Sequence, residues 1–143
     1  MKRCLADVNV WLALLVRQHE HHKRVRKWFE NLAASEAGLC RVVQLGLVRL
    51  LANRSIMGDD ALSALAAWDL IGELLEDERL DFIPEPPDLD SVLPGLLTYP
   101  VPTGKLVNNA YMAAFATCAS RRLTTLDRGF RQFRGLDLDL IQA

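Results

Sequence analysis

Several features that mark secreted or membrane proteins are scarce in this sequence. Its three cysteines, Cys4, Cys40 and Cys118, are odd in number and widely spaced, which argues against a disulfide framework and against a cysteine metal site. The longest apolar stretch, Val10–Val16, is far too short to span a bilayer. Asp7 interrupts the apolar run near the start, so a signal peptide is not indicated. We expect a cytoplasmic protein that makes no use of a membrane.

A strong excess of one charge is also missing, because the formal net charge is −1. The distribution is uneven: residues 1–54 carry ten Lys or Arg against four acids, whereas residues 69–90 carry nine acids and one Arg. A second basic segment lies at residues 121–134. If the two basic segments meet, their aspartates would form an acidic pocket inside a basic rim, a field suited to holding a polyanion around a metal. An ordinary mixed-charge surface is the alternative.

The chain has the length and composition of a single domain over residues 1–143, with 50% hydrophobic residues and no internal repeats. Apolar patterns predict an alternation of strands and helices, which implies a parallel sheet covered on both faces. Strands are expected at residues 4–6, 39–43, 80–83, 123–126 and 138–141. Helices are expected at residues 9–16, 19–32, 44–53, 61–75, 88–97 and 106–119, with Pro-rich loops at 84–87 and 99–104.

Two of the short apolar runs end in an aspartate. Cys4–Ala6 reaches Asp7, and Leu123–Leu126 reaches Asp127. Because parallel strands present their carboxyl ends at one edge of a sheet, the two carboxylates are expected to lie together, as a divalent metal requires. Each could instead be a helix cap with only a structural role. Asn9 is expected to accept a backbone N–H and open the first helix.

Three further features have two readings each. The cluster His19-Glu20-His21-His22 is expected to be a helix start on the surface, with a metal site as the alternative. Gly46 lies inside an expected helix at a cost of roughly 1 kcal/mol relative to Ala, which suggests close packing or space for something. Arg49 lies on an otherwise apolar helix, either as an ion-paired structural residue or reaching the pocket.

Four stretches, in this order and spacing, resemble PIN domains, and specifically the VapC toxins of bacterial toxin–antitoxin systems. They are D-V-N-V-W-L-A-L-L with the following H-E-H-H and W-F, C-R-V-V-Q-L-G-L-V-R-L-L, N-A-Y-M-A-A-F-A, and L-T-T-L-D-R-G-F-R-Q-F-R-G-L. The resemblance implies a three-layer α/β/α sandwich with a central parallel sheet of four or five strands. It also implies an endoribonuclease that cleaves RNA phosphodiesters with Mg²⁺ or Mn²⁺, and a cognate VapB-like antitoxin. A homodimer is expected, with the helices around Trp28 and Trp68 as candidate interfaces.

The resemblance also assigns the site. Asp7 matches the first family aspartate and Asp127 the last, while Asn109 occupies a position where members usually have an aspartate. These three residues are the expected catalytic and metal-binding set. Asn109 keeps an amide oxygen but brings no charge, so metal affinity should be lower and the nuclease weakened. The expected supporting residues are Asn9, Gln44, Arg49 and Arg128; Gly46 falls near the position of a glutamate found in many members.

Two other functions compete with the nuclease. The first is a PIN-fold binding or dimerisation module without catalysis, which Asn109 favours. The second is a phosphatase of the haloacid-dehalogenase type, suggested by a first strand that ends D-x-N. That family needs a second aspartate where this chain has Asn9, and no lysine follows at a fitting position, so the phosphatase is disfavoured.

Overall fold

A computed structural model describes residues 2–98 and 104–142 of the chain. Five strands form one sheet in the order β3-β2-β1-β4-β5, and every neighbouring pair is parallel. The strands are β1 Cys4–Ala6, β2 Ala37–Leu39, β3 Leu80–Phe82, β4 Arg122–Thr125 and β5 Leu138–Leu140. The central strands β1 and β4 are adjacent although they lie at opposite ends of the sequence. The expected parallel sheet is confirmed, and it has five strands.

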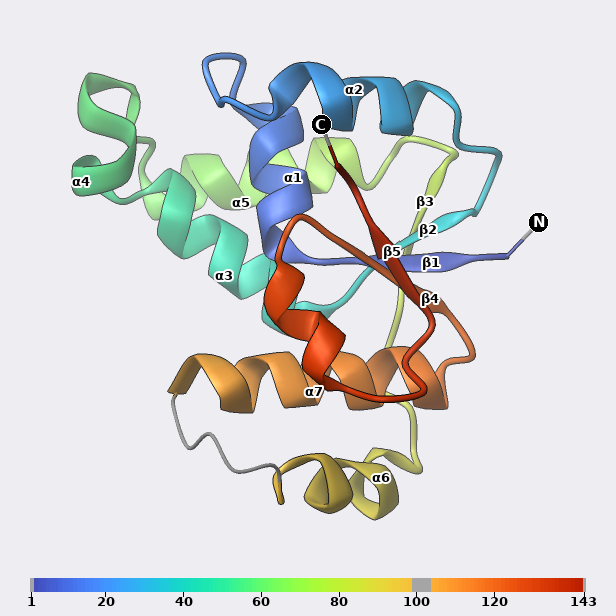
Figure 1. Cartoon of the computed structure of the whole chain (residues 1–143). Coiled ribbons are helices and arrows are strands. Elements are labelled where there is room, and N and C mark those ends of the chain that lie inside the picture. The colour runs from blue at the N-terminus through green and yellow to red at the C-terminus, as the bar shows by residue number, and fades with distance from the viewer. Residues whose placement is uncertain (1, 99–103, 143) are drawn as a thin grey trace.

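Helices cover both faces of this sheet (Figure 1). They are α1 Val8–Leu15, α2 His22–Glu30, α3 Arg41–Leu51, α4 Arg54–Met57, α5 Ala64–Leu74, α6 Leu89–Leu96 and α7 Gly104–Cys118, with 3-10 turns η1 Gly58–Asp60 and η2 Arg128–Gln132. In Figure 1, α1, α2 and α5 lie on one side of the sheet, and α7 lies on the other with α6 against its outer side. α3 packs against α1 and α5. The predicted three-layer α/β/α sandwich is confirmed.

α7 packs close to the sheet because its inner side is built from small residues. Its alanines Ala110, Ala113, Ala114 and Ala116 are at most 1% exposed, and they surround a buried Phe115. Small side chains let the helix backbone approach β4, while Phe115 fills the remaining volume. This packing sets the distance between α7 and the sheet, and therefore the position of Asn108 and Asn109 in the first half of the helix.

The start of α1 differs from the expectation. Asp7, rather than Asn9, is the N-cap: its backbone is extended and its side chain accepts the Val8 N–H. Asn9 lies in the first turn of the helix, and its side chain reaches β4 instead. The sequence offered two capping residues two positions apart, and the strand end decided between them, because the chain must leave β1 at Asp7.

Two other boundaries were predicted wrongly. The strand expected at residues 39–43 is β2, which ends at Leu39, and α3 already begins at Arg41. The β-branched pair Val42-Val43 favours a strand locally, but burial of Val43 with Leu47 and Leu51 at helical spacing prevails. α5 begins at Ala64 rather than residue 61, because the Ser63 hydroxyl caps it by accepting the Ala66 N–H.

The short helix α4 and the turn η1 were not anticipated in the segment between α3 and α5. The loop expected at residues 84–87 precedes α6, whereas the loop expected at 99–104 lies outside the described residues except for Gly104, which begins α7. Among the described residues, no helix is long and apolar enough to cross a membrane.

Candidate active site

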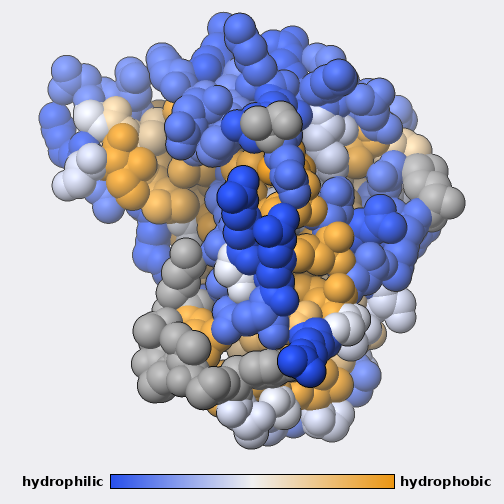
Figure 2. Space-filling model, in the orientation of Figure 1, coloured by the Kyte–Doolittle hydropathy of each residue, from blue (hydrophilic) through white to orange (hydrophobic). Residues whose placement is uncertain are grey.

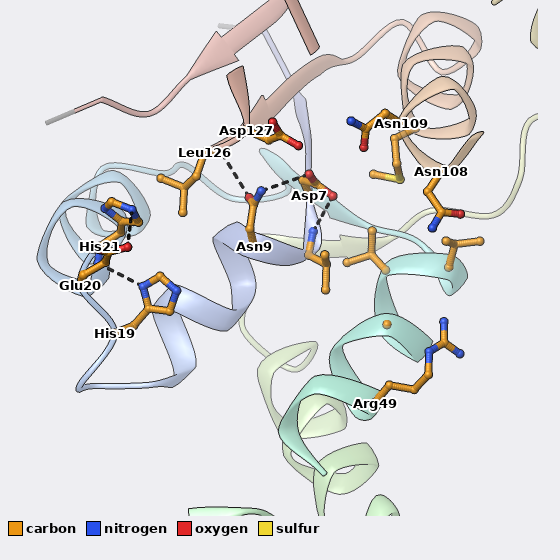
Figure 3. A pocket seen from close by; sticks show the side chains of 15 residues that line it. Asp7, Asn9, His19, Glu20, His21, Arg49, Asn108, Asn109, Leu126 and Asp127 are labelled. Atoms are coloured by element: carbon orange, nitrogen blue, oxygen red, sulfur yellow. Dashed lines mark hydrogen bonds and ion pairs between the residues drawn. The ribbon is translucent and has the colours of Figure 1, made fainter. Parts of the chain in front are cut away.

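A pocket of about 520 Å³ opens at the carboxyl end of β1 and β4. Its wall is formed by the start of α1, the segment before α2, one side of α3, the first half of α7 and the residues after β4. Figure 3 shows Asp7, Asn9 and Asp127 on one side of the pocket, with Asn108 and Asn109 projecting from α7 beside them. The structure thus brings Asp7, Asn109 and Asp127 to one pocket, although they are separated by most of the sequence.

Asp7 is held rigidly at the end of β1. Its backbone N–H donates to the Thr124 carbonyl of β4 at 2.9 Å, which continues the sheet up to the aspartate. One carboxylate oxygen, Oδ1, accepts the Val8 N–H at 2.8 Å. The side chain is only 8% exposed, so its orientation is fixed by its surroundings. A buried carboxylate at a helix N-terminus is favoured by the partial positive charge there.

Thr125 links the two strand ends through one hydroxyl. Its Oγ1 donates to Asp7 Oδ2 at 3.1 Å and accepts the Asp127 backbone N–H at 3.0 Å. Asn9 completes the connection, since its Nδ2 lies 3.3 Å from both Asp7 Oδ2 and Thr125 Oγ1 and its Oδ1 accepts the Leu126 N–H at 3.2 Å. Asn9 was expected to support Asp7, and its contacts are consistent with that role. Thr125 was missed, because a threonine in a strand is ordinary and nothing in the sequence distinguishes it from Thr124.

Asp127 and Asn109 meet above Gly129. Asp127 Oδ1 accepts the Gly129 N–H at 2.8 Å and thereby caps η2. A Cβ added to Gly129 would lie 3.0 Å from Asp127 Oδ1 and 3.7 Å from Asn109 Nδ2. A side chain at position 129 would therefore fill the space beside these two groups. Glycine leaves this space free.

The other predicted supporting residues divide into two groups. Arg49 lines the pocket from α3, in agreement with one of its two readings. Gln44 and Arg128 are not among the residues that line it. Gln44 is buried and accepts a hydrogen bond from Arg41 Nη1 at 2.5 Å, while Arg128 begins η2 after Asp127. Gln44 was expected as a supporting residue because the resemblance pairs it with Arg49 in the stretch Q-L-G-L-V-R, but of these two only Arg49 lines the pocket.

The histidine cluster lies at the start of a helix, as expected, because His21 is the N-cap of α2 and His22 is its first residue. Only His22 belongs to α2, while His19, Glu20 and His21 precede the helix and line the pocket. Their place in the pocket wall was not expected, because adjacent histidines on a single helix would point apart. The loop between α1 and α2 folds back so that these side chains face the site.

The donor set fits a divalent ion that is held weakly. The carboxylates of Asp7 and Asp127 and the side-chain amide of Asn109 line the same pocket. Mg²⁺ is commonly bound by one or two carboxylates, with waters and substrate phosphate completing its octahedron. Among the described residues, no three His, Cys, Asp or Glu side chains are grouped closely enough to hold a metal.

A PIN-domain family model matches residues 4–136 of the chain. This chain belongs to the PIN-domain family. It is 34% identical over 142 residues to the Mycobacterium tuberculosis protein named Ribonuclease VapC41, with 96% of this chain and 97% of that protein covered. The resemblance to PIN domains of the VapC type, expected from four short stretches, is confirmed over nearly the full length.

Solved VapC structures have the same fold as this PIN domain. The DNA-bound VapBC of Salmonella typhimurium matches with a TM-score of 0.70 at 14% identity, over 99% of this chain and 100% of that one. The Mycobacterium tuberculosis VapC20, a toxin that cleaves the sarcin-ricin loop, matches with a TM-score of 0.65 at 16% identity, over 90% and 93% of the two chains. At these identities the likeness establishes the fold alone.

Proposed function

We propose that this PIN domain is a metal-dependent endoribonuclease toxin of a toxin–antitoxin system. The observation that carries the proposal is the meeting of Asp7, Asn109 and Asp127 in one pocket at the sheet edge. Membership of the PIN family and 34% identity to a protein named as a ribonuclease support the same reaction class. The substrate is RNA, and the bond broken is a phosphodiester.

The metal is Mg²⁺ or Mn²⁺, in keeping with the general dependence of PIN-domain ribonucleases on a divalent ion. Asp7, Asp127 and the amide oxygen of Asn109 would hold it. When bound, such an ion polarises a phosphoryl oxygen and activates a water for in-line attack. Thr125 and Asn9 keep the Asp7 carboxylate in place through their hydrogen bonds. Held in this way, the Asp7 carboxylate would present its oxygens to the ion in one fixed orientation.

Arg49 gives the pocket a cationic side opposite its carboxylates. It lies in the last turn of α3 and lines the pocket with Asn108 on the neighbouring helix α7. An arginine there can donate to phosphate oxygens in a forked geometry. We assign Arg49 to a phosphate of the RNA and Asn108 to a polar contact at the same wall.

The proposed physiological partner is a VapB-like antitoxin in the cytoplasm, bound so that the pocket is closed. Several structural neighbours are VapBC toxin–antitoxin complexes, which supports this assignment. A pocket with several carboxylates and an open side is suited to a partner that inserts a cationic side chain.

A second candidate is a catalytically silent PIN-fold binding module. The observation that favours it is Asn109, which removes one negative charge from the proposed metal site and cannot act as a base. Silence predicts metal binding too weak to measure at physiological concentrations, together with retained binding of a partner. The nuclease hypothesis predicts slow but metal-dependent cleavage.

Cleavage of a structured RNA in Mg²⁺ and in Mn²⁺ distinguishes the two. The wild type is expected to cleave slowly, and Asp7→Asn is expected to lower the rate by a further 10²-fold or more, on the scale of a lost catalytic group. Asp60→Asn is the matched control, because Asp60 is exposed on η1 and does not line the pocket. Equal rates for wild type and Asp7→Asn would rule out the proposed site.

A further inference from the structure

The pocket has a wall that the proposed metal chemistry does not use. His19, Glu20 and His21, here called the histidine wall, line the pocket from the segment between α1 and α2. Figure 3 shows them on the side opposite Arg49. The ring centroids of His19 and His21 are 5.5 Å apart, so two imidazoles lie side by side along this wall.

The protonation of His19 follows from its hydrogen bond. Its Nδ1 accepts the backbone N–H of His21 at 3.1 Å, so in the neutral ring the proton is on Nε2. Burial lowers the pKa of His19, and the nearby His21 and His22 add to this, against the opposing effect of Glu20. The ring is therefore neutral at pH 7 and above, and it carries one N–H donor.

The second histidine of the wall has both nitrogens engaged. His21 Nδ1 lies 2.6 Å from Arg24 Nη2, and because a guanidinium only donates, Nδ1 is the acceptor. Its Nε2 then faces Glu20 Oε1 at 3.4 Å. These contacts fix the His21 ring beside the His19 ring. In the described part of the chain, no hydrogen bond to His19 Nε2 is present, which leaves that N–H for a ligand.

The chemistry of this donor selects its ligand. A neutral ring with a single in-plane N–H suits an acceptor atom on the edge of a nucleobase. A phosphate is better matched by the permanently charged Arg49 on the opposite side. We propose that His19 is a specificity-determining residue that reads one base next to the scissile phosphate of the RNA. This inference rests on the proposed function in taking RNA as the ligand.

The test compares three variants by binding. Fluorescence anisotropy measures the affinity of each protein for sets of four short RNAs that differ in the base at one position, with one set for each position along the strand. Ca²⁺ replaces Mg²⁺, so that binding is measured without cleavage. His19→Phe keeps a flat ring without the donor, and His19→Gln places an amide N–H near the position of Nε2. Gln18→Ala is the control, because Gln18 is exposed in the same segment and does not line the pocket.

The wild type and Gln18→Ala are expected to prefer one base at one position by about three- to tenfold, the range of one hydrogen bond. His19→Phe is expected to reduce the preference to under about twofold, and His19→Gln to retain most of it. The inference is overturned if the wild type binds none of the RNAs or binds all four bases equally. It is also overturned if His19→Phe keeps the base preference of the wild type. A base preference that depends on His19, without cleavage of the RNA in Mg²⁺, would contradict the nuclease proposal but would still support base recognition by His19.

Discussion

At the scale of single residues, one hydroxyl connects the two strand ends that carry the site. Thr125→Val keeps the shape of the side chain but removes the donor to Asp7 Oδ2 and the acceptor for the Asp127 N–H. We expect a loss of about 1–3 kcal/mol in the free energy of unfolding, the penalty of leaving such groups unpaired. Metal affinity should fall as well, because Asp7 loses one of the hydrogen bonds that fix its orientation. Urea denaturation and a Mn²⁺ titration measure the two effects.

The matched control is Thr124→Val, one residue earlier in the same strand. The Thr124 hydroxyl bonds to Asp139 Oδ2 at 3.3 Å, and Asp139 does not line the pocket. This variant should lose stability while its metal affinity stays unchanged. If Thr125→Val binds Mn²⁺ as the wild type does, the hydroxyl does not organise the metal site.

Single residues also show how far the sequence could predict the site. Asp7 and Asp127 were recognisable because each follows a short apolar run, and the order of strands then placed them together. Thr125 carries no such mark, since its function depends on which face of β4 it occupies. The place of His19 depended on a loop conformation, which apolar periodicity does not encode.

At the scale of elements, Gly46 and Gly38 differ in the space that is available for a side chain. A Cβ on Gly46 of α3 would meet Val8 Cγ2 at 3.6 Å, an ordinary contact. Of the two readings of Gly46, the structure favours available space over close packing. Gly46→Ala is therefore expected to raise the free energy of unfolding by about 0.5–1 kcal/mol, because alanine is the better helix former.

Gly38 of β2 provides the contrast. A Cβ there would lie 2.7 Å from Ile83 Cγ1 and 3.2 Å from the Cys4 carbonyl, so the neighbouring strands would have to shift. Gly38→Ala is expected to destabilise the fold by about 1–3 kcal/mol. Thermal unfolding of the two variants side by side checks both signs, and a stabilised Gly38→Ala would contradict the packing described here.

The elements themselves were largely predictable, and the errors were at their ends. β1 was placed correctly and β3, β4 and β5 to within one residue, because short apolar runs bounded by polar residues are distinctive. The end of β2 and the start of α5 were misplaced, since β-branched residues and competing caps allow two local solutions. Tertiary burial of Val43 and the cap at Ser63 decided between them.

At the scale of the whole molecule, the expected homodimer stays a prediction. Of its two candidate interfaces, around Trp28 and around Trp68, the structure favours the one around Trp68. Trp28 packs edge-on against Trp11 at 5.8 Å and is partly buried against the core, whereas Trp68 on α5 is 40% exposed. Arg41 lies over the rings of both Trp68 and Phe82, at 5.6 and 4.9 Å, which joins α3, α5 and β3 in one surface. Figure 2 shows mainly polar side chains over α2 and apolar ones near α3 and α4.

Light scattering at micromolar concentration tests this assembly. The wild type is expected to have twice the chain mass of 16.1 kDa, and Trp68→Arg to shift toward the monomer, because a charge would be buried in the interface. Leu97→Arg, at an exposed apolar residue following α6, is the control and should not change the mass. A monomer mass for the wild type would contradict the expected homodimer.

Asn109→Asp is the decisive variant, because Asn109 is proposed to lie in the metal site and to weaken the binding of the ion. The substitution restores a charge beside Asp7 and Asp127 with little change of shape, so the fold is retained while like charges lower the stability of the metal-free protein somewhat. Mg²⁺ affinity and the rate of RNA cleavage are both expected to rise, the rate by roughly 10²–10⁴-fold, the scale of a restored acid–base group. Calorimetric Mg²⁺ titration and cleavage of a structured RNA, measured on wild type and variant together, are the decisive comparison. Equal affinity and equal cleavage in the two proteins would contradict the claim and place Asn109 outside the metal site.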